Sequence, residues 1–106
     1  MEKISLNEIS RKIAIPWSPV DVLFVNNSVV RMAKMEGEFA WHKHDNSDEA
    51  FLVFDGEFTL QTKEKNLNLK KGEGILVPKG VLHCSKTTSS ATVLLFELKD
   101  TKQHGD

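Results

Sequence analysis

The fold of this 106-residue chain is decided by the stretch GEFAWHKHDNSDEAFLVFDG, Gly37–Gly56. Its second half, Ala50–Phe54, is apolar at every position and is followed by the turn signal Asp55-Gly56. Because successive side chains of a strand point to opposite faces, a strand here needs cover on both faces. We expect one face to line the interior of a barrel and the other to pack on the N-terminal segment or on a second subunit.

Pieces of the same length continue on both sides of this stretch. From Val20 to Leu98, apolar pieces alternate with turn signals such as Asn26-Asn27, Lys71-Gly72 and Lys79-Gly80. This pattern predicts about nine strands: Asp21–Val25, Val29–Met35, Phe39–His44, Ala50–Phe54, Phe58–Thr62, Leu67–Leu69, Ile75–Val77, Leu82–Lys86 and Thr92–Leu98. Short strands at this spacing are typical of an all-β sandwich or barrel, and we expect one closed or nearly closed barrel.

The N-terminal end differs from the barrel. Ser5 and Glu8 have the S-x-x-E spacing of a capping box, with apolar residues behind them at helical intervals, which predicts one short helix. Pro16 and Pro19 lack backbone donors and end that helix. We therefore expect a single domain over residues 1–106, with a helix and arm at 1–19, the barrel at 20–98 and a polar tail at 99–106.

Composition argues against several classes of protein. The chain has 14 Lys and Arg against 15 Asp and Glu, which gives a net charge of -1. A nucleic-acid-binding protein is therefore disfavoured, since it would need an excess of basic residues. No segment approaches the ~20 apolar residues of a membrane span. The single Cys84 cannot form an internal disulfide and Met1–Arg11 lacks the apolar run of a signal peptide, so we expect a cytoplasmic protein. A chain of 12.0 kDa has little spare length to cover the strand Ala50–Phe54, which favours a homodimer.

Three of the four histidines form a candidate metal site with one glutamate. Residues two apart in a strand share a face, so His42 and His44 can present their imidazoles to one cation. Glu49 follows a polar stretch suited to a turn, and His83 would supply a third nitrogen. Imidazole and carboxylate suit Fe, Mn, Co, Ni, Cu or Zn, and without thiolates a closed structural zinc site is disfavoured. We expect one divalent transition metal ion, of unspecified identity, in an open site of catalytic type.

The spacing of these residues resembles the two motifs of the cupins, a family of small β-barrels. The first reads Gly37-x4-His42-x-His44-x4-Glu49-x6-Gly56, and the second reads Gly72-x5-Pro78-x-Gly80-x2-His83. Two departures occur: four residues where five usually separate the first Gly and His, and Thr87 where the family has Asn. Neither removes a ligand. The resemblance implies a cupin barrel (jelly roll, or double-stranded β-helix), and dimers are frequent in the family.

Within the cupins, the chain looks like a small bacterial single-domain group. The likeness takes in Trp17-Ser18-Pro19 and the closing Gly105-Asp106. Members of the group are often labelled mannose-6-phosphate-isomerase-like, although no activity is settled for it. A phosphosugar isomerase needs Arg or Lys converging on the phosphate, and Arg11, Arg31 and the lysines show no such cluster. We therefore discount that activity.

Strand alternation predicts the surroundings of the metal. Ala40, Phe51 and Val53 share faces with the ligands and would form a mostly apolar cavity, with Met32 and Met35 as weaker candidates for its mouth. Trp41 should point away from the metal, and Cys84 should be a buried, inert thiol. Strand alternation places no acidic or basic side chain beside the metal other than the ligands, which argues mildly against an isomerase.

For function, we favour a metal-dependent enzyme acting on an unidentified small oxygenated molecule, of oxygenase or isomerase type. No catalytic residue beyond the ligands is assigned. The alternative is a noncatalytic cupin module that binds or senses a small molecule, which a short chain with an apolar pocket would serve equally well. A storage-type structural protein suits so short a chain poorly. Fold alone does not separate these classes.

Overall fold

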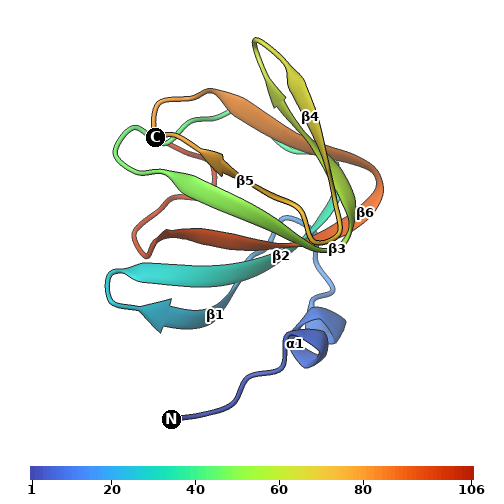
Figure 1. Cartoon of the computed structure of the whole chain (residues 1–106), viewed down its shortest axis with the longest axis vertical. Coiled ribbons are helices and arrows are strands. Elements are labelled where there is room, and N and C mark those ends of the chain that lie inside the picture. Colours follow the sequence, from blue (N-terminus) through green and yellow to red (C-terminus); the bar gives the residue numbers. More distant parts are fainter.

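The computed structural model describes all 106 residues as one helix and six antiparallel strands. The strands follow one another in the sheet as β1-β2-β6-β3-β4, with β5 paired to β3. Figure 1 shows how the sheet curls, so that β1 and β2 lie apart from β4 and β5 while β3 and β6 join the two sides. The all-β prediction is confirmed. The elements are α1 (Leu6–Lys12), β1 (Val20–Val25), β2 (Ser28–Glu38), β3 (Glu49–Thr62), β4 (Asn66–Lys70), β5 (Gly74–Val77) and β6 (His83–Leu98).

The count of nine strands was wrong because two long strands each join two of the predicted pieces. Asp55-Gly56 lies inside β3, where the pairing with β6 shifts register between Val53 and Asp55 and again between Gly56 and Thr59. Gly56 has φ of +77°, and a Cβ there would lie 2.3 Å from the Ser90 carbonyl oxygen. A β-bulge bends the strand at this close backbone approach, where the sequence suggests a turn.

The predicted strand Phe39–His44 was also wrong. Gly37, with φ of +70°, follows a register shift in the pairing of β2 with β6, and β2 ends at Glu38. Beyond it the segment keeps only one isolated bridge, between His42 and His83. The two candidate ligands of this segment therefore lie on irregular backbone.

The predicted helix is confirmed, and the arm behind it reaches the barrel. The Ser5 hydroxyl accepts a hydrogen bond from the Glu8 amide at 3.3 Å, as expected of an N-cap. In the arm, the Trp17 ring stacks on Phe39 at 4.8 Å between centroids, and its Nε1–H donates to the Glu36 carbonyl at 2.8 Å. The helix has seven residues, and no helix of the structure is long and apolar enough to cross a membrane.

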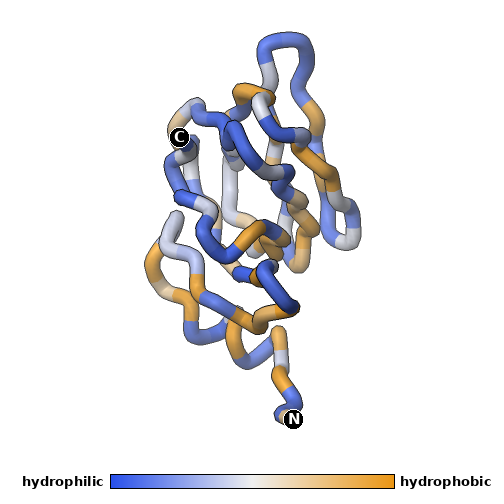
Figure 2. Tube along the Cα trace, turned by 90° about the vertical axis from the view of Figure 1, so that its left-hand side faces the viewer, coloured by the Kyte–Doolittle hydropathy of each residue, from blue (hydrophilic) through white to orange (hydrophobic).

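The core fills the inside of the curled sheet. As predicted for Ala50–Phe54, one face is buried, with Phe51 and Val53 pointing inward. The alternate residues Ala50, Leu52 and Phe54 are half-buried on the outer face. The hairpin tip between β3 and β4, Lys63–Lys65, is exposed and hydrophilic (Figure 2). The core cluster comprises Ala33, Met35, Phe51, Val53, Phe58, Leu60, Leu69, Val77, Ala91, Val93 and Leu95.

Candidate metal centre

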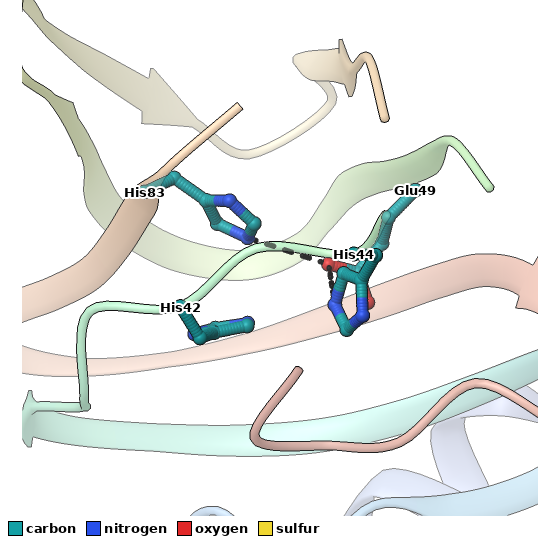
Figure 3. A group of neighbouring side chains, drawn as sticks. All are labelled: His42, His44, Glu49 and His83. Carbon is teal, nitrogen blue, oxygen red and sulfur yellow. Dashed lines mark ion pairs between the residues drawn. The ribbon is translucent and has the colours of Figure 1, made fainter. Parts of the chain in front are cut away.

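The four predicted ligands come together at one end of the core (Figure 3). His42 and His44 lie on the irregular segment between β2 and β3, Glu49 is the first residue of β3, and His83 is the first residue of β6. One potential ligand atom from each residue lies within 4.8 Å of those of the other three. His44, Glu49 and His83 are buried and His42 is half-buried. The fold therefore gathers the whole predicted set, although only two of its members stand in strands.

Three buried atoms in this cluster have no hydrogen-bond partner: Glu49 Oε1, His44 Nε2 and His83 Nε2. The glutamate oxygen lies 3.5 Å from the His44 nitrogen and 3.6 Å from the His83 nitrogen, too far for good hydrogen bonds. An unpaired buried polar group costs free energy. A shared cation would satisfy all three atoms, because two ligands each about 2.1 Å from an ion lie about 3.0–3.4 Å apart. The donor set thus fits a transition metal.

Backbone carbonyls orient two of the imidazoles. The Nδ1 of His42 lies 2.9 Å from the Ala40 carbonyl oxygen, and the Nδ1 of His83 lies 2.8 Å from that of Val81. With the proton on Nδ1 donated to these carbonyls, the Nε2 lone pair of each ring is free to bind a cation. Such outer hydrogen bonds fix the tautomer and ring orientation of metal-binding histidines.

The charges within the cluster depend on one another. Burial opposes the ionised form of Glu49, but the contacts with His44 and His83 outweigh it and hold the pKa of the carboxyl well below its usual range. The Glu49 contact raises the pKa of His44. Burial lowers the pKa of His42, and the neighbouring His83 lowers it further. The cluster therefore contains an ionised carboxylate and at least one imidazole that favours the neutral, metal-binding form.

A cavity of about 60 Å³ adjoins the cluster. The predicted Phe51 and Met35 do line it, but Ala40 is exposed, while Val53 and Met32 are buried elsewhere. Ala40 was misplaced because its segment is not a strand. The lining comprises Trp17, Pro19, Arg31, Ala33, Met35, Phe39, His42, Glu49, Phe51, Ser85, Leu95, Glu97 and Gln103.

Two other residues lie as the sequence indicates. Trp41 is exposed and does not line the cavity, and the Lys63 ammonium lies 4.3 Å from its ring centroid. Cys84 is fully buried and unpaired, and its Sγ lies 3.6 Å from the Phe39 carbonyl oxygen. Burial raises the pKa of the Cys84 thiol, which disfavours the reactive thiolate.

Sequence reasoning missed the polar residues of the cavity wall. Glu97 on β6 is 7% exposed, and its carboxylate accepts a hydrogen bond from Arg31 Nη1 at 2.9 Å. Burial and the neighbouring Glu49 raise the pKa of Glu97 to about 8. Ser85, also buried, lines the same cavity. A signal for Glu97 did exist, because residues 91, 93, 95 and 97 share one strand face that is otherwise apolar.

Comparisons with known proteins agree with this architecture. A family model described as "Cupin domain" matches residues 28–98. An uncharacterized Bacillus subtilis (strain 168) protein, YdbB, is 38% identical over 76 residues, which cover 71% of this chain and 67% of the relative. The crystal structure of a cupin-2 domain containing protein from Shewanella frigidimarina is 30% identical, with a TM-score of 0.89 over 91% of this chain and 94% of the other.

A second solved structure, protein NMB1881 from Neisseria meningitidis, has a TM-score of 0.85 at 24% identity. It covers 92% of this chain and all of the other, and at that identity the likeness shows the fold alone. None of these matches carries the mannose-6-phosphate-isomerase label.

Proposed function

The chain belongs to the cupin family, and on this premise we propose that it is a metal-dependent enzyme acting on a small oxygenated molecule. The proposed ligands of its one divalent transition metal ion are His42, His44, Glu49 and His83. The observation that carries the proposal is the convergence of three unpartnered buried atoms, from Glu49, His44 and His83, beside a cavity. The metal could be Fe, Mn, Ni, Zn, Co or Cu, since these ligands leave the choice to cellular availability.

The cavity wall suits a small molecule with an apolar body. A bound metal would supply a Lewis acid that polarises a coordinated oxygen. Phe51, Met35 and Leu95 keep water away from that position, while the Ser85 hydroxyl can bind a second polar atom of the ligand. A volume of about 60 Å³ is well below the ~150 Å³ of a cavity that binds benzene, so the cavity admits only a few non-hydrogen atoms of the ligand.

The charge of the wall disfavours an anionic group far from the metal. Arg31 is the lining cation, and it is already paired with Asp21 and Glu97, each at 2.9 Å. A phosphate would find no unpaired cation beside the cavity, which argues against a phosphosugar isomerase. Glu97 does supply the acid or base group that the parity argument lacked. Isomerase chemistry therefore stands beside oxygenase chemistry.

The alternative is a noncatalytic module that binds or senses the same kind of molecule. Native mass spectrometry of freshly purified protein would identify a ligand that co-purifies, and aerobic turnover of that ligand would then be followed with the Fe(II), Mn(II) and Ni(II) forms. The enzyme proposal expects at least one form to convert it. If a tightly bound ligand is returned unchanged by every form, the binding module is the better account.

We also propose that the protein is a homodimer. The outer face carries the exposed Leu76, Phe96 and Leu98 around the half-buried Ala50, and these side chains line one hollow. A second copy would cover this apolar surface. Light scattering should give about twice the 12.0 kDa of the chain, and Phe96→Asp should return it to a single chain. A mass of one chain for the unmodified protein would contradict the proposal.

The proposed setting is the cytoplasm. Cys84, the one cysteine of the chain, is buried and unpaired, which fits a compartment where disulfides are rare. Fractionation of the producing cells would test this, with recovery outside the cytoplasm as the contrary result.

A further inference from the structure

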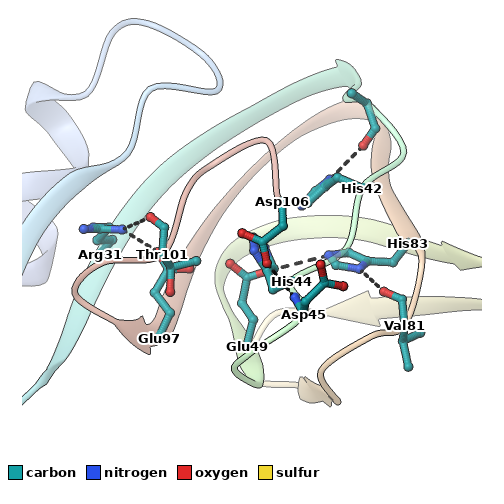
Figure 4. Close-up of polar contacts among 11 residues, drawn as sticks. Arg31, His42, His44, Asp45, Glu49, Val81, His83, Glu97, Thr101 and Asp106 are labelled. Carbon is teal, nitrogen blue, oxygen red and sulfur yellow. Dashed lines mark hydrogen bonds and ion pairs between the residues drawn. The ribbon is translucent and has the colours of Figure 1, made fainter.

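The polar tail that follows β6 contacts the segment that carries His42 and His44. Figure 4 shows Asp106 beside Asp45 and His44, and Arg31 on the strand side of the same tail. Resting on the metal site proposed above, we propose that Asp106 and Gly105 are positioning residues: they hold the segment His42–Asp45 so that the two imidazoles face the cation. We name residues 99–106 the C-terminal strap.

The hydrogen bonds of the segment His42–Asp45 show why it needs the strap. On one side, His42 exchanges two backbone hydrogen bonds with His83, both 2.9 Å, and the His44 carbonyl accepts from the Gly80 amide at 2.7 Å. On the other side, every backbone hydrogen bond goes to Asp106. The Lys43 carbonyl accepts from the Asp106 amide at 3.0 Å, and the Asp45 amide donates to the Asp106 carboxylate at 2.7 Å.

These two bonds flank His44, one on the residue before it and one on the residue after it. His44 lies outside every strand, so no sheet ladder fixes its backbone. Its imidazole has no hydrogen bond to a carbonyl of the kind that orients His42 and His83. Asp106 therefore takes the place that an outer hydrogen bond to the ring usually has in a metal site, by fixing the backbone on both sides of the ligand.

Gly105 allows the strap to come this close. Its φ is +82°, and a Cβ at this position would lie 2.3 Å from the Lys43 carbonyl oxygen and 3.0 Å from His42 Cβ. Backbone cannot yield to such an overlap, so a side chain here would push the strap off the segment. The close approach places Asp106 within reach of Lys43 and Asp45.

Three further side chains fasten the strap to the barrel. Arg31 donates to the Lys99 carbonyl at 2.9 Å and to that of Thr101 at 3.4 Å. The Gln103 amide donates to the Trp17 carbonyl, and Gln103 also lines the cavity. The His104 ring stacks on Phe39 at 4.9 Å between centroids. The strap is thus held along its length, so the residues before Asp106 keep it beside the segment His42–Asp45.

The test compares the Zn²⁺ dissociation constants of full-length variants by competition with a chromophoric chelator, with any purification tag at the amino end. Asp106→Ala removes the acceptor for the Asp45 amide and should weaken Zn²⁺ binding about tenfold to a hundredfold, the usual effect of losing an outer partner of a metal site. Asp106→Asn keeps an acceptor oxygen and should restore binding close to that of the unmodified protein. Asp100→Ala is the matched control, because it removes the same charge from an exposed strap residue without a side-chain hydrogen bond.

Gly105→Ala supplies an independent perturbation, since it leaves Asp106 in place and should weaken Zn²⁺ binding to the same extent. The urea midpoint of the metal-free variants should move little, which separates positioning of the ligands from a loss of folding. Unchanged affinity in both Asp106→Ala and Gly105→Ala, with the unmodified protein binding Zn²⁺, overturns the role of the strap and leaves the metal site standing. If the unmodified protein binds Zn²⁺ no better than His44→Ala, both proposals fall.

Discussion

Arg31 joins three parts of the molecule, so replacing it by methionine is a demanding test of the structure. Methionine keeps much of the length of the side chain and removes the charge and every donor. The guanidinium, only 19% exposed, pairs with the buried Glu97 and the exposed Asp21, and it donates to the carbonyls of Lys99 and Thr101. Arg31→Met therefore frees the strap and leaves the Glu97 carboxyl without its cation.

The expected loss follows from the separate contacts. The charged hydrogen bond to the buried Glu97 is worth about 1.5–3 kcal/mol, and the one to the Lys99 carbonyl adds about 1 kcal/mol. The pair with Asp21, whose side chain is 52% exposed, contributes less than about 1 kcal/mol. We predict that Arg31→Met lowers the free energy of unfolding by about 3 kcal/mol.

The loss should grow with pH. In the folded protein burial and Glu49 raise the pKa of Glu97 to about 8, and Arg31 opposes this rise. Without Arg31 the folded pKa rises further while the unfolded value stays near 4.5, so the folded state binds more protons than the unfolded state over a wider range. The stability of the variant therefore falls more steeply than that of the parent as pH increases from about 7 to 9.

The assay is urea unfolding of metal-free protein at pH 7 and pH 9. A double-mutant cycle of Arg31→Met with Glu97→Gln isolates the coupling, and Arg11→Met is the matched control, an exposed arginine without an ion pair. The cycle should show a coupling of at least 1 kcal/mol that increases at pH 9. A loss below about 0.5 kcal/mol, or the same loss with Glu97 replaced, would contradict this role of Arg31.

Further predictions concern the bulge, the helix cap and the metal. Gly56→Ala should destabilise the fold by more than about 1 kcal/mol in thermal unfolding, because its Cβ meets the Ser90 carbonyl; Gly72→Ala, which also has positive φ but open space, is the control, and equal losses would contradict this reason. Ser5→Ala should lower the stability of helix α1 by about 0.5–2 kcal/mol, so that its amides lose protection in hydrogen exchange; unchanged protection would show that the Ser5 cap does not stabilise the helix. Zn²⁺ affinity should rise with pH through the neutral range, because the Glu49 contact raises the pKa of His44 and a proton on this ring competes with the metal; an affinity that does not depend on pH would argue against His44 as a ligand.

The fold could be predicted from the sequence, but the number of strands could not. Apolar pieces and turn residues show where the chain alternates in a sheet, and the capping box of Ser5 shows where the helix begins. A glycine with positive φ serves a hairpin turn and a β-bulge equally well. Asp55-Gly56 is therefore ambiguous until the partner strand is known, and Ser90 on β6 is distant in sequence.

The four candidate ligands could be selected from the sequence for a different reason. His42, His44, Glu49 and His83 have chemistry that few residue types share, and their spacing matches a family pattern. The four side chains cluster although His42 and His44 lie outside any strand, because the isolated bridge to His83 keeps their segment beside the barrel. Ala40 is exposed and not on the face of the ligands, because a single bridge does not impose strand alternation on its segment.

The sequence did not predict two parts of the site: Glu97 in the cavity wall, and the strap, which contacts the backbone beside His44. Glu97 could have been found from the face that it shares with Val93 and Leu95. Nothing in the polarity of the strap distinguishes it from a solvated tail, because its contacts with Lys43 and Asp45 use an amide and a carboxylate that most tails also possess. Long-range backbone pairing of this kind leaves no periodic signal in the sequence.

The metal content of reloaded protein tests whether the four clustered side chains hold one metal ion. Chelator-treated protein would be loaded with Zn²⁺, passed through gel filtration and analysed for zinc, together with His44→Ala and with Glu64→Ala as a control in the exposed hairpin tip outside the cluster. We expect one zinc ion per chain for the unmodified protein and for Glu64→Ala, and almost none for His44→Ala. Retention of one ion by His44→Ala, or of none by the unmodified protein, would contradict this metal site.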